Sequence, residues 1–191
     1  MMPAQRWTDA ELNRRCRQAD PAAWRELIRR ETPRIYRLAL KMLRDPADAE
    51  DACQETFMRI HRSHGSYDPT RPLAPWVSRI TYNVCLRRLQ GTPQKVANTA
   101  ERADQGDVRD PRAANPEQGA ATREAHRLLG AAFDTLSAQD RALLTLRYRE
   151  GLSDAEVADA VDMPINTVKT RIFRARQKLR QELAPQLKDE R

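Results

Sequence analysis

The stretch GLSDAEVADAVDMPINTVKTRIFRARQKLR, from Gly151 to Arg180, determines how the C-terminal part of this 191-residue chain folds. Ser153 followed three residues later by Glu156 is a capping box, which predicts the start of a short helix. A turn is predicted at Asp162, and a longer helix of about 18 residues begins near Pro164. A short capped helix, a tight turn and a longer basic helix predict a helix-turn-helix, which places its second helix in the major groove of DNA.

The longer helix has one apolar side and one basic side. Its apolar residues recur at the spacing of a single buried stripe, which comprises Val168, Ile172, Ala175 and Leu179. Residues 164–181 include six basic residues and no acidic one, which favours a polyanionic partner over the alternative of an ordinary solvated helix. The residues expected to read base edges are Asn166, Lys169, Thr170, Phe173 and Arg174. Thr167 completes the DNA-binding set, and phosphate contact or packing suits Arg171, Arg176, Lys178 and Arg180 better.

The composition of the whole chain favours a helical fold. Lys and Arg number 34 against 27 Asp and Glu, a net charge of +7, and only 5% of residues are aromatic. With six glycines, this profile indicates an all-α fold and excludes a β-sandwich or an α/β barrel. No apolar run approaches the length of a membrane span, and the N-terminus lacks the apolar segment of a secretory signal, so we expect a cytoplasmic location.

Metal sites, disulfides and catalytic groups are not indicated by the sequence. Cys16, Cys53 and Cys85 are far apart, form no CxxC pair and fall on apolar faces, so we expect small core residues. His61 and His64 lack further ligands at suitable spacing. Since no phosphate-binding glycine-rich loop or catalytic triad is apparent either, we expect neither a cofactor nor enzymatic activity.

Residues 8–90 predict a run of helices with clear start signals. Thr8 and Glu11 form a capping box, and Asp20-Pro21 and Asp45-Pro46 each combine an N-cap residue with proline at the first helical position. Residues 61–75 contain one glycine and three prolines and indicate a loop, after which a last helix begins near Pro75.

Residues 91–122 differ from both flanking parts. They are rich in Gly, Pro, Ala and polar residues, and Val96 and Val108 are their only large apolar side chains. Because such a stretch cannot bury a core, it predicts a flexible linker between two small helical domains, residues 8–90 and 123–187.

Three stretches resemble conserved regions of bacterial sigma factors, most closely those of the extracytoplasmic-function (ECF) group. Residues 151–180 are similar to the last conserved region, whereas DPADAEDACQETFMRIHR (residues 45–62) and APWVSRITYNVCLRRL (residues 74–89) are similar to the second. Their order, and the lack of a middle domain between them, match the ECF arrangement. Asp162 and Asn166 stand where the group usually has glycine, and both residue types tolerate a positive φ better than most.

The resemblance implies that the chain binds core RNA polymerase. An acidic and amide-bearing helix face would contact the clamp coiled coil of the largest subunit, and the polymerase flap would be a second contact. That face comprises Asp48, Asp51, Gln54, Glu55 and Arg59. Taken without the resemblance, an ordinary solvated face explains the same pattern.

The resemblance also implies recognition of −35 duplex DNA by the helix-turn-helix and capture of the melted −10 strand by the N-terminal domain. Strand capture needs aromatic surfaces, cations for phosphates and a pocket for a flipped base. The residues that supply these groups are Ser66, Tyr67, Arg71, Trp76, Arg79, Tyr82, Asn83, Arg87 and Arg88. The base-capturing loop corresponds to residues 66–75, and Trp76 is alternatively a core residue.

Promoter recognition would require a scaffold that holds the two domains apart. A flexible linker of 32 residues has a root-mean-square span of roughly 30 Å. Promoter elements about 25 base pairs apart are separated by roughly 85 Å. The resemblance implies that the linker runs through polymerase channels, where a cationic tunnel would suit its acidic residues Glu101, Asp104, Asp107, Asp110 and Glu117.

The sequence leaves the regulator of the protein and one rival function open. The resemblance implies an anti-sigma partner, often a membrane protein, that would hold the chain inactive at the inner membrane. The rival is a stand-alone helix-turn-helix regulator that binds DNA without polymerase, usually as a symmetric dimer. No apparent dimerisation helix follows Leu187, which counts against that rival.

Overall fold

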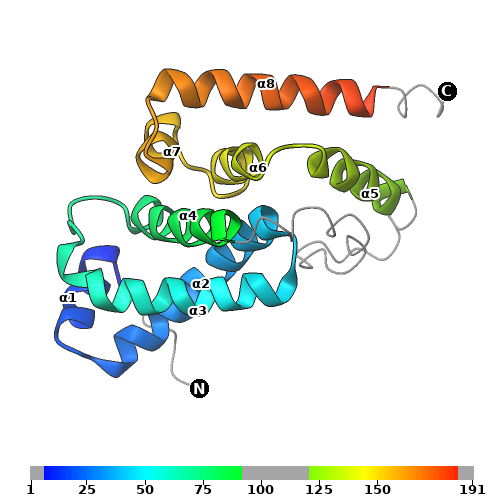
Figure 1. Cartoon of the computed structure of the whole chain (residues 1–191). Coiled ribbons are helices and arrows are strands. Elements are labelled where there is room, and N and C mark those ends of the chain that lie inside the picture. Colours follow the sequence, from blue (N-terminus) through cyan, green and yellow to red (C-terminus); the bar gives the residue numbers. More distant parts are fainter. Residues whose placement is uncertain (1–6, 92–120, 185–191) are drawn as a thin grey trace.

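A computed structural model describes residues 7–91 and 121–184, and within these ranges every regular element is a helix (Figure 1). The N-terminal domain comprises α1 (Asp9–Arg17), α2 (Pro21–Leu43), α3 (Pro46–Ser63), the 3₁₀ turn η1 (His64–Ser66) and α4 (Leu73–Gly91). The C-terminal domain comprises α5 (Ala121–Asp134), α6 (Ala138–Leu144), the π-helical turn η3 (Thr145–Arg149), α7 (Asp154–Val161) and α8 (Ile165–Leu183). The all-α prediction is confirmed.

The predicted linker lies almost entirely outside the described residues. The same holds for its acidic residues Glu101, Asp104, Asp107, Asp110 and Glu117, and for residues 185–187 at the end of the predicted C-terminal domain. None of the helices in the two described ranges has the length and apolar character needed to cross a membrane.

The three capped helix starts predicted for the N-terminal domain are present. Thr8 and Glu11 exchange hydrogen bonds as a capping box at α1. Asp20 accepts a hydrogen bond of 2.8 Å from the backbone N–H of Ala22 at α2, and Asp45 accepts one of 2.9 Å from Asp48 at α3. Short polar side chains therefore begin these helices, because they satisfy N–H groups that have no partner within the helix.

The predicted loop at residues 61–75 is shorter than expected. α3 continues to Ser63, η1 follows, and α4 begins at Leu73 rather than near Pro75. The early start has a tertiary cause, since the Leu73 backbone N–H donates a 3.0 Å hydrogen bond to the Asp9 carboxylate on α1. A cap supplied by a distant residue leaves no local sequence signal.

The three cysteines are buried core residues, as predicted. Cys16, Cys53 and Cys85 are free thiols in the interior of the N-terminal domain. Burial raises the pKa of Cys16 and Cys53 to about 11 and that of Cys85 to about 12. All three thiols therefore stay protonated at neutral pH, which favours a packing role.

The helix-turn-helix of the C-terminal domain forms as predicted. Ser153 and Glu156 exchange the hydrogen bonds of a capping box at the start of α7. Asp162 ends α7 in the left-handed conformation, with φ of 55°, so aspartate takes the position that glycine usually fills. The stripe of α8 is buried, since Val168, Ile172 and Ala175 are each at most 6% exposed and Leu179 is partly buried.

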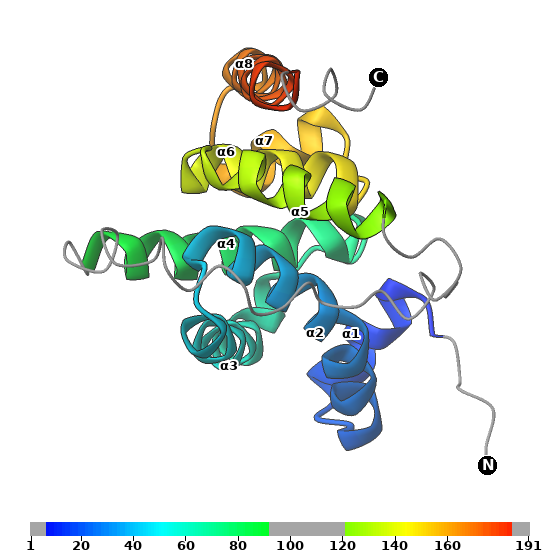
Figure 2. The same cartoon turned by 90° about the vertical axis from the view of Figure 1, so that its right-hand side faces the viewer.

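The two domains pack directly against each other, which the sequence does not predict. α6 and α7 lie against α2 and α4, and α8 forms an outer layer over α6 and α7 (Figures 1 and 2). One cluster of buried side chains crosses the boundary and joins Leu38 and Tyr82 to Leu146 and Val157. The expectation of two bodies on a loose tether is therefore incomplete, because in this structure they share a core.

Candidate nucleic-acid and polymerase interfaces

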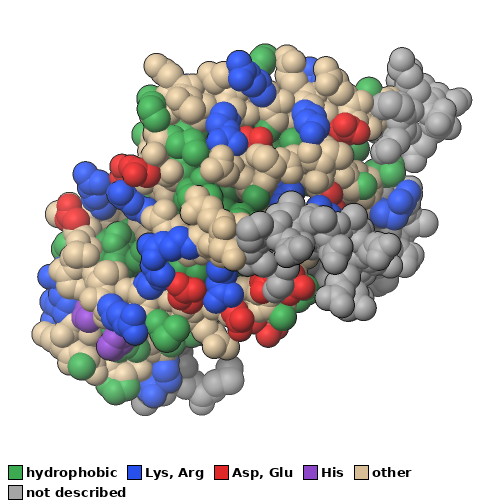
Figure 3. Space-filling view, in the orientation of Figure 1, with side chains coloured by type: hydrophobic (Ala, Val, Ile, Leu, Met, Phe, Trp, Pro, Cys, Tyr) green, Lys and Arg blue, Asp and Glu red, His purple; other side chains and the backbone are tan. Residues whose placement is uncertain are grey.

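α8 presents its polar side to solvent at the edge of the molecule. Asn166, Thr167, Lys169, Thr170 and Arg174 are exposed, and Phe173 is 59% exposed although it is aromatic. Lys and Arg side chains project from the upper part of the molecule, which α8 and its neighbours form (Figure 3). This surface combines amide, hydroxyl, cationic and apolar groups, which are the side chains that read base edges in the major groove.

Two cations of the predicted DNA-binding set instead fix α8 to the rest of its domain. Arg171 forms a 2.8 Å ion pair with Asp140 and donates a 2.7 Å hydrogen bond to Gln139, both on α6. The Lys178 ammonium donates a 2.6 Å hydrogen bond to the carbonyl of Thr135, which follows α5. In this structure both cations hydrogen-bond within their own domain, and the phosphate contact that the sequence also allowed for them stays a prediction.

The environment of Arg176 differs from those of the exposed residues of α8 and of Arg171 and Lys178. Its guanidinium lies 5.8 Å from the ring centre of Tyr148, an exposed aromatic side chain on η3, and Arg147 lies at the same distance. Both contacts are cation–π interactions. They place one further aromatic group beside the basic surface of α8, and the sequence did not single it out.

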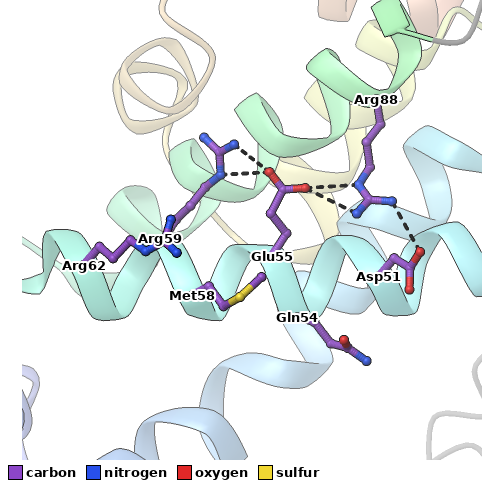
Figure 4. Close-up of a pocket in the computed structure, with 7 residues that line it drawn as sticks. All are labelled: Asp51, Gln54, Glu55, Met58, Arg59, Arg62 and Arg88. Carbon is purple, nitrogen blue, oxygen red and sulfur yellow. Dashed lines mark hydrogen bonds and ion pairs between the residues drawn. The ribbon is translucent and has the colours of Figure 1, made fainter.

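A groove with a volume of about 560 Å³ runs along α3 and contains most of the predicted polymerase-binding face (Figure 4). Its lining residues are Asp51, Gln54, Glu55, Met58, Arg59, Arg62 and Arg88. Asp48, the remaining predicted residue, lies one helical turn before Asp51 and is not among them.

Glu55 lies at the centre of this groove between two arginines. One carboxylate oxygen accepts a hydrogen bond of 3.0 Å from Arg59 Nε, and the other accepts two of 3.3 Å from Arg88. Partial burial opposes ionisation, but these hydrogen bonds outweigh it and lower the pKa of Glu55. Arg88 also forms a 3.6 Å ion pair with Asp51. The groove therefore holds fixed charges of both signs.

Three lining residues add to what the sequence predicted for this face. Arg88 was assigned to the −10 strand, yet it joins the groove because α4 packs alongside α3. Met58 is 53% exposed and supplies an apolar surface, and Arg62 supplies a further cation. The helical spacing of Asp51, Met58 and Arg62 along α3 is a signal that could have included the last two.

The residues predicted to capture the −10 strand are only partly accessible. Ser66, Arg71, Arg79 and Arg87 are exposed, and Asn83 is half-buried. Tyr67 and Tyr82 are each 2% exposed, so neither ring faces solvent in this structure.

The two rings nearest the predicted base-capturing loop belong to the core of the N-terminal domain. The Tyr67 hydroxyl donates a hydrogen bond to the Arg71 carbonyl, and its ring centre lies 5.1 Å from that of Trp76. Trp76 is partly buried and packs against the core cluster that contains Tyr67. The core alternative considered for Trp76 therefore describes its packing.

Comparison with known proteins identifies both domains. Residues 27–92 match the family model Sigma-70 region 2, and residues 126–179 match Sigma-70, region 4. The chain is 37% identical over 168 residues to the ECF RNA polymerase sigma factor SigE of Mycolicibacterium smegmatis, and the match covers 87% of this chain and 64% of that protein. It is 30% identical over 189 residues to the ECF RNA polymerase sigma-E factor of Haemophilus influenzae, covering 95% and 98% of the two chains.

The fold is also that of a solved sigma factor. The structure of RpoE in complex with the anti-sigma factor NepR, from Bartonella quintana, aligns with a TM-score of 0.64 at 22% identity, covering 84% of this chain and 96% of that chain. The chain therefore belongs to the ECF RNA polymerase sigma factors, non-enzymatic proteins that direct RNA polymerase to promoters, and it carries sigma-70 regions 2 and 4.

Proposed function

We propose that the two domains divide promoter recognition between them. The C-terminal domain contacts −35 duplex DNA through α8, the N-terminal domain captures the melted −10 strand through α4 and the loop before it, and the α3 groove binds core polymerase. The observation that best supports this division is the exposed side of α8, which lies opposite its buried stripe. A helix with that arrangement fits the major groove of B-DNA.

The exposed residues of α8 suit particular base contacts. Arg174 has the geometry for paired hydrogen bonds to guanine, Asn166 for paired hydrogen bonds to adenine, and Phe173 for apolar contact with a thymine methyl group. The Thr170 hydroxyl donates a 2.8 Å hydrogen bond to the Asn166 carbonyl, which fixes its orientation along the helix. Lys169 and Arg176 suit phosphates, which set the register of the domain on the duplex.

The α3 groove suits a protein helix that carries charged and apolar residues. Glu55, Arg59 and Arg88 hold each other in place, so their positions are fixed before a partner binds. Fixed charges contribute to specificity because less side-chain freedom is lost on binding. The proposed partner is the clamp coiled coil of the largest polymerase subunit, with the flap as a second contact.

We also propose regulation by an anti-sigma factor. The similar Bartonella structure contains a sigma factor bound to an anti-sigma factor, which supports a partner of this class. A membrane-anchored partner would retain this chain on the cytoplasmic side of the inner membrane. Purification of the tagged chain from uninduced cells should recover a small partner in place of polymerase, and recovery of holoenzyme alone would contradict the proposal.

Reconstitution of the full chain with core RNA polymerase tests the proposed function. Transcription from a library of genomic fragments should begin at discrete sites only when both components are present. Core enzyme that initiates identically with and without the chain would refute the proposal. Tight, sequence-specific binding to duplex DNA by the chain alone would instead favour the stand-alone regulator.

A further inference from the structure

The N-terminal helix α1 holds the first part of the base-capturing loop, residues 66–75. Arg17, in the last turn of α1, donates two hydrogen bonds through Nη2, one of 2.9 Å to the Gly65 carbonyl and one of 2.8 Å to the Tyr67 carbonyl. The two acceptors lie 48 and 50 residues away in the sequence, so the contact is tertiary. Hydrogen bonds from a charged donor are stronger than those between neutral groups. Arg17 therefore fixes the backbone where the loop begins.

The opposite end of α1 holds the end of the same loop. Asp9, in the first turn of α1, accepts a 3.0 Å hydrogen bond from the backbone N–H of Leu73, the residue at which α4 begins. α1 also packs against η1, beside the connection between α3 and α4 (Figure 1). A helix of nine residues thus contacts the loop at both of its ends.

Hydrogen bonds within the loop define the shape of its tip. The Tyr67 hydroxyl donates to the Arg71 carbonyl, and burial raises the pKa of Tyr67 to about 12, so this hydroxyl keeps its proton and stays a donor. The Asp68 carboxylate accepts hydrogen bonds of 2.9 Å from the Thr70 backbone N–H and 2.7 Å from the Thr70 hydroxyl. The tip is thus ordered by its own residues, whereas the contacts with α1 and the buried Tyr67 ring determine where it lies on the domain.

The side chains of the tip face solvent although its backbone is held. Ser66 and residues 68–72 are exposed, whereas Tyr67 and Leu73 are buried. A site that selects one base among four needs its polar groups at defined positions before the base arrives. A loop that had to become ordered on binding would lose affinity by the cost of that ordering. The contacts with α1 reduce this cost.

Arg17 and Asp9 lie outside the part of the chain that matches Sigma-70 region 2, which is residues 27–92. That match therefore gives neither residue a role. Arg17 is also exposed, so its two hydrogen bonds are not needed to satisfy a buried charge. Direct contact with a DNA phosphate is an alternative role for an exposed arginine beside this loop.

We propose that Arg17 and Asp9 are positioning residues for −10 recognition, through which α1 holds the base-capturing loop in the conformation that accepts a flipped base. Neither side chain touches the base itself. The inference deepens the proposed function and rests on it, because the property that α1 improves is the selection of −10 bases by the loop.

Four variants of the full chain test the proposal. Arg17→Ala removes the hydrogen bonds at the start of the loop, and Asp9→Ala removes the one at its end. Arg17→Lys keeps the charge and a donor. Arg14→Ala removes another exposed arginine from the same helix, about one turn earlier, and is the matched control.

Hydrogen–deuterium exchange of the free chain measures the order of the loop directly. The backbone N–H groups of Tyr67, Thr70 and Arg71 are hydrogen-bonded within the loop, so they report on its opening. Arg17→Ala and Asp9→Ala should each speed exchange in residues 64–73 by about three- to tenfold, the range for losing one or two hydrogen bonds. Arg14→Ala should exchange as the wild type does.

Transcription by the reconstituted holoenzyme measures the consequence for recognition. The probe is one promoter recovered from the genomic fragments, remade with each of the four bases at every −10 position. Arg17→Ala and Asp9→Ala should reduce the ratio of initiation rates between the best and worst base by about three- to tenfold, at one or two positions only. Preferences in the −35 element and the dependence on salt should stay as in the wild type, and Arg17→Lys should recover part of the loss.

Each contrary result has its own meaning. Wild-type holoenzyme that initiates at no discrete site would refute the proposed function. If the wild type selects −10 bases and both alanine variants select them equally well, the positioning role is wrong and the proposed function stands.

A uniform loss at all bases, with a weaker salt dependence for Arg17→Ala and full recovery by Arg17→Lys, would identify a phosphate contact and would also overturn the proposal. Circular dichroism checks that the variants are folded. If Arg17→Ala is not, Asp9→Ala decides the outcome by the same two measurements, because it acts on the other end of the loop.

Discussion

α8 and α4 are the two helices assigned to DNA, and their packing is opposite in kind. α8 packs through one stripe, which includes Val168 and Ile172, and exposes its other side. α4 packs on α2 and α3 and also on α7, so that Val77 and Tyr82 are buried in two different clusters. The polar side of an edge helix is visible in its sequence pattern, whereas the covered face of a central helix is not.

The largest expected effect tests the single packed stripe of α8. Ile172→Ala should lower the free energy of unfolding by about 2–5 kcal/mol, because it leaves a cavity in the shared core. Ile165→Ala makes the same substitution on the same helix, where the isoleucine is 39% exposed, and should lower the free energy of unfolding by less than about 1 kcal/mol. Urea unfolding followed by circular dichroism measures both. Equal losses would mean that α8 is packed on both sides, as α4 is.

The next prediction compares the functions of α8, which has an exposed side, and α4, which is covered by other helices. Arg174→Ala should weaken binding to −35 duplex by about 1–3 kcal/mol at one base position, because it removes a base contact. Arg79→Ala should slow open-complex formation by the holoenzyme, because it removes an exposed cation proposed to contact the −10 strand.

Binding to duplexes with single-base changes and permanganate footprinting of the holoenzyme measure these two effects. Uniform weakening of Arg174→Ala across all sequences would identify a phosphate contact instead. A holoenzyme with Arg79→Ala that melts promoters normally would remove Arg79 from the −10 set.

The α3 groove extends the comparison to a second open surface. Asp51→Ala combined with Gln54→Ala should weaken binding to core polymerase by about 1–2 kcal/mol, the range of moderate interface residues. Stability should change little, because both side chains are exposed. Glu50→Ala, also exposed on α3 but outside the groove lining, is the control. In competition with labelled wild type, indistinguishable affinities of the double variant and the control would exclude this face.

The smallest effect concerns the cap of α7, the helix that covers α4. Ser153→Ala should cost about 1 kcal/mol of stability, because it removes the hydroxyl that begins the helix. Hydrogen bonds from the Ser153 side chain and backbone lower the pKa of Glu156 below its ordinary 4.5. That contribution is present above pH 4.5 and is lost as the pH falls through the lowered value. The difference between variant and wild type should therefore shrink as Glu156 becomes protonated in acid, and a difference that stays constant throughout the acid titration of Glu156 would exclude its role.

Local signals in the sequence predicted most of the helices and which side of α8 is exposed. The caps at Thr8 and Ser153 are present because each hydroxyl satisfies a nearby backbone N–H. Asp162 adopts a positive φ because its short polar side chain tolerates that conformation. The buried stripe of α8 follows from its helical period. All of these depend on residues within a few positions of each other.

Only the tertiary structure decided which polar residues face solvent and which face each other. Arg171 and Lys178 belong to the basic side of α8 by spacing, yet α6 and the end of α5 engage them. Arg88 lines the α3 groove, and Tyr82 is buried where the two domains meet. The contacts of Glu150 and Arg141 with α2 carry no local signal, because these partners lie about a hundred residues away in the sequence. Periodicity reports which side of a helix is polar, but the burial of a charge depends on what packs there and whether a partner is within reach.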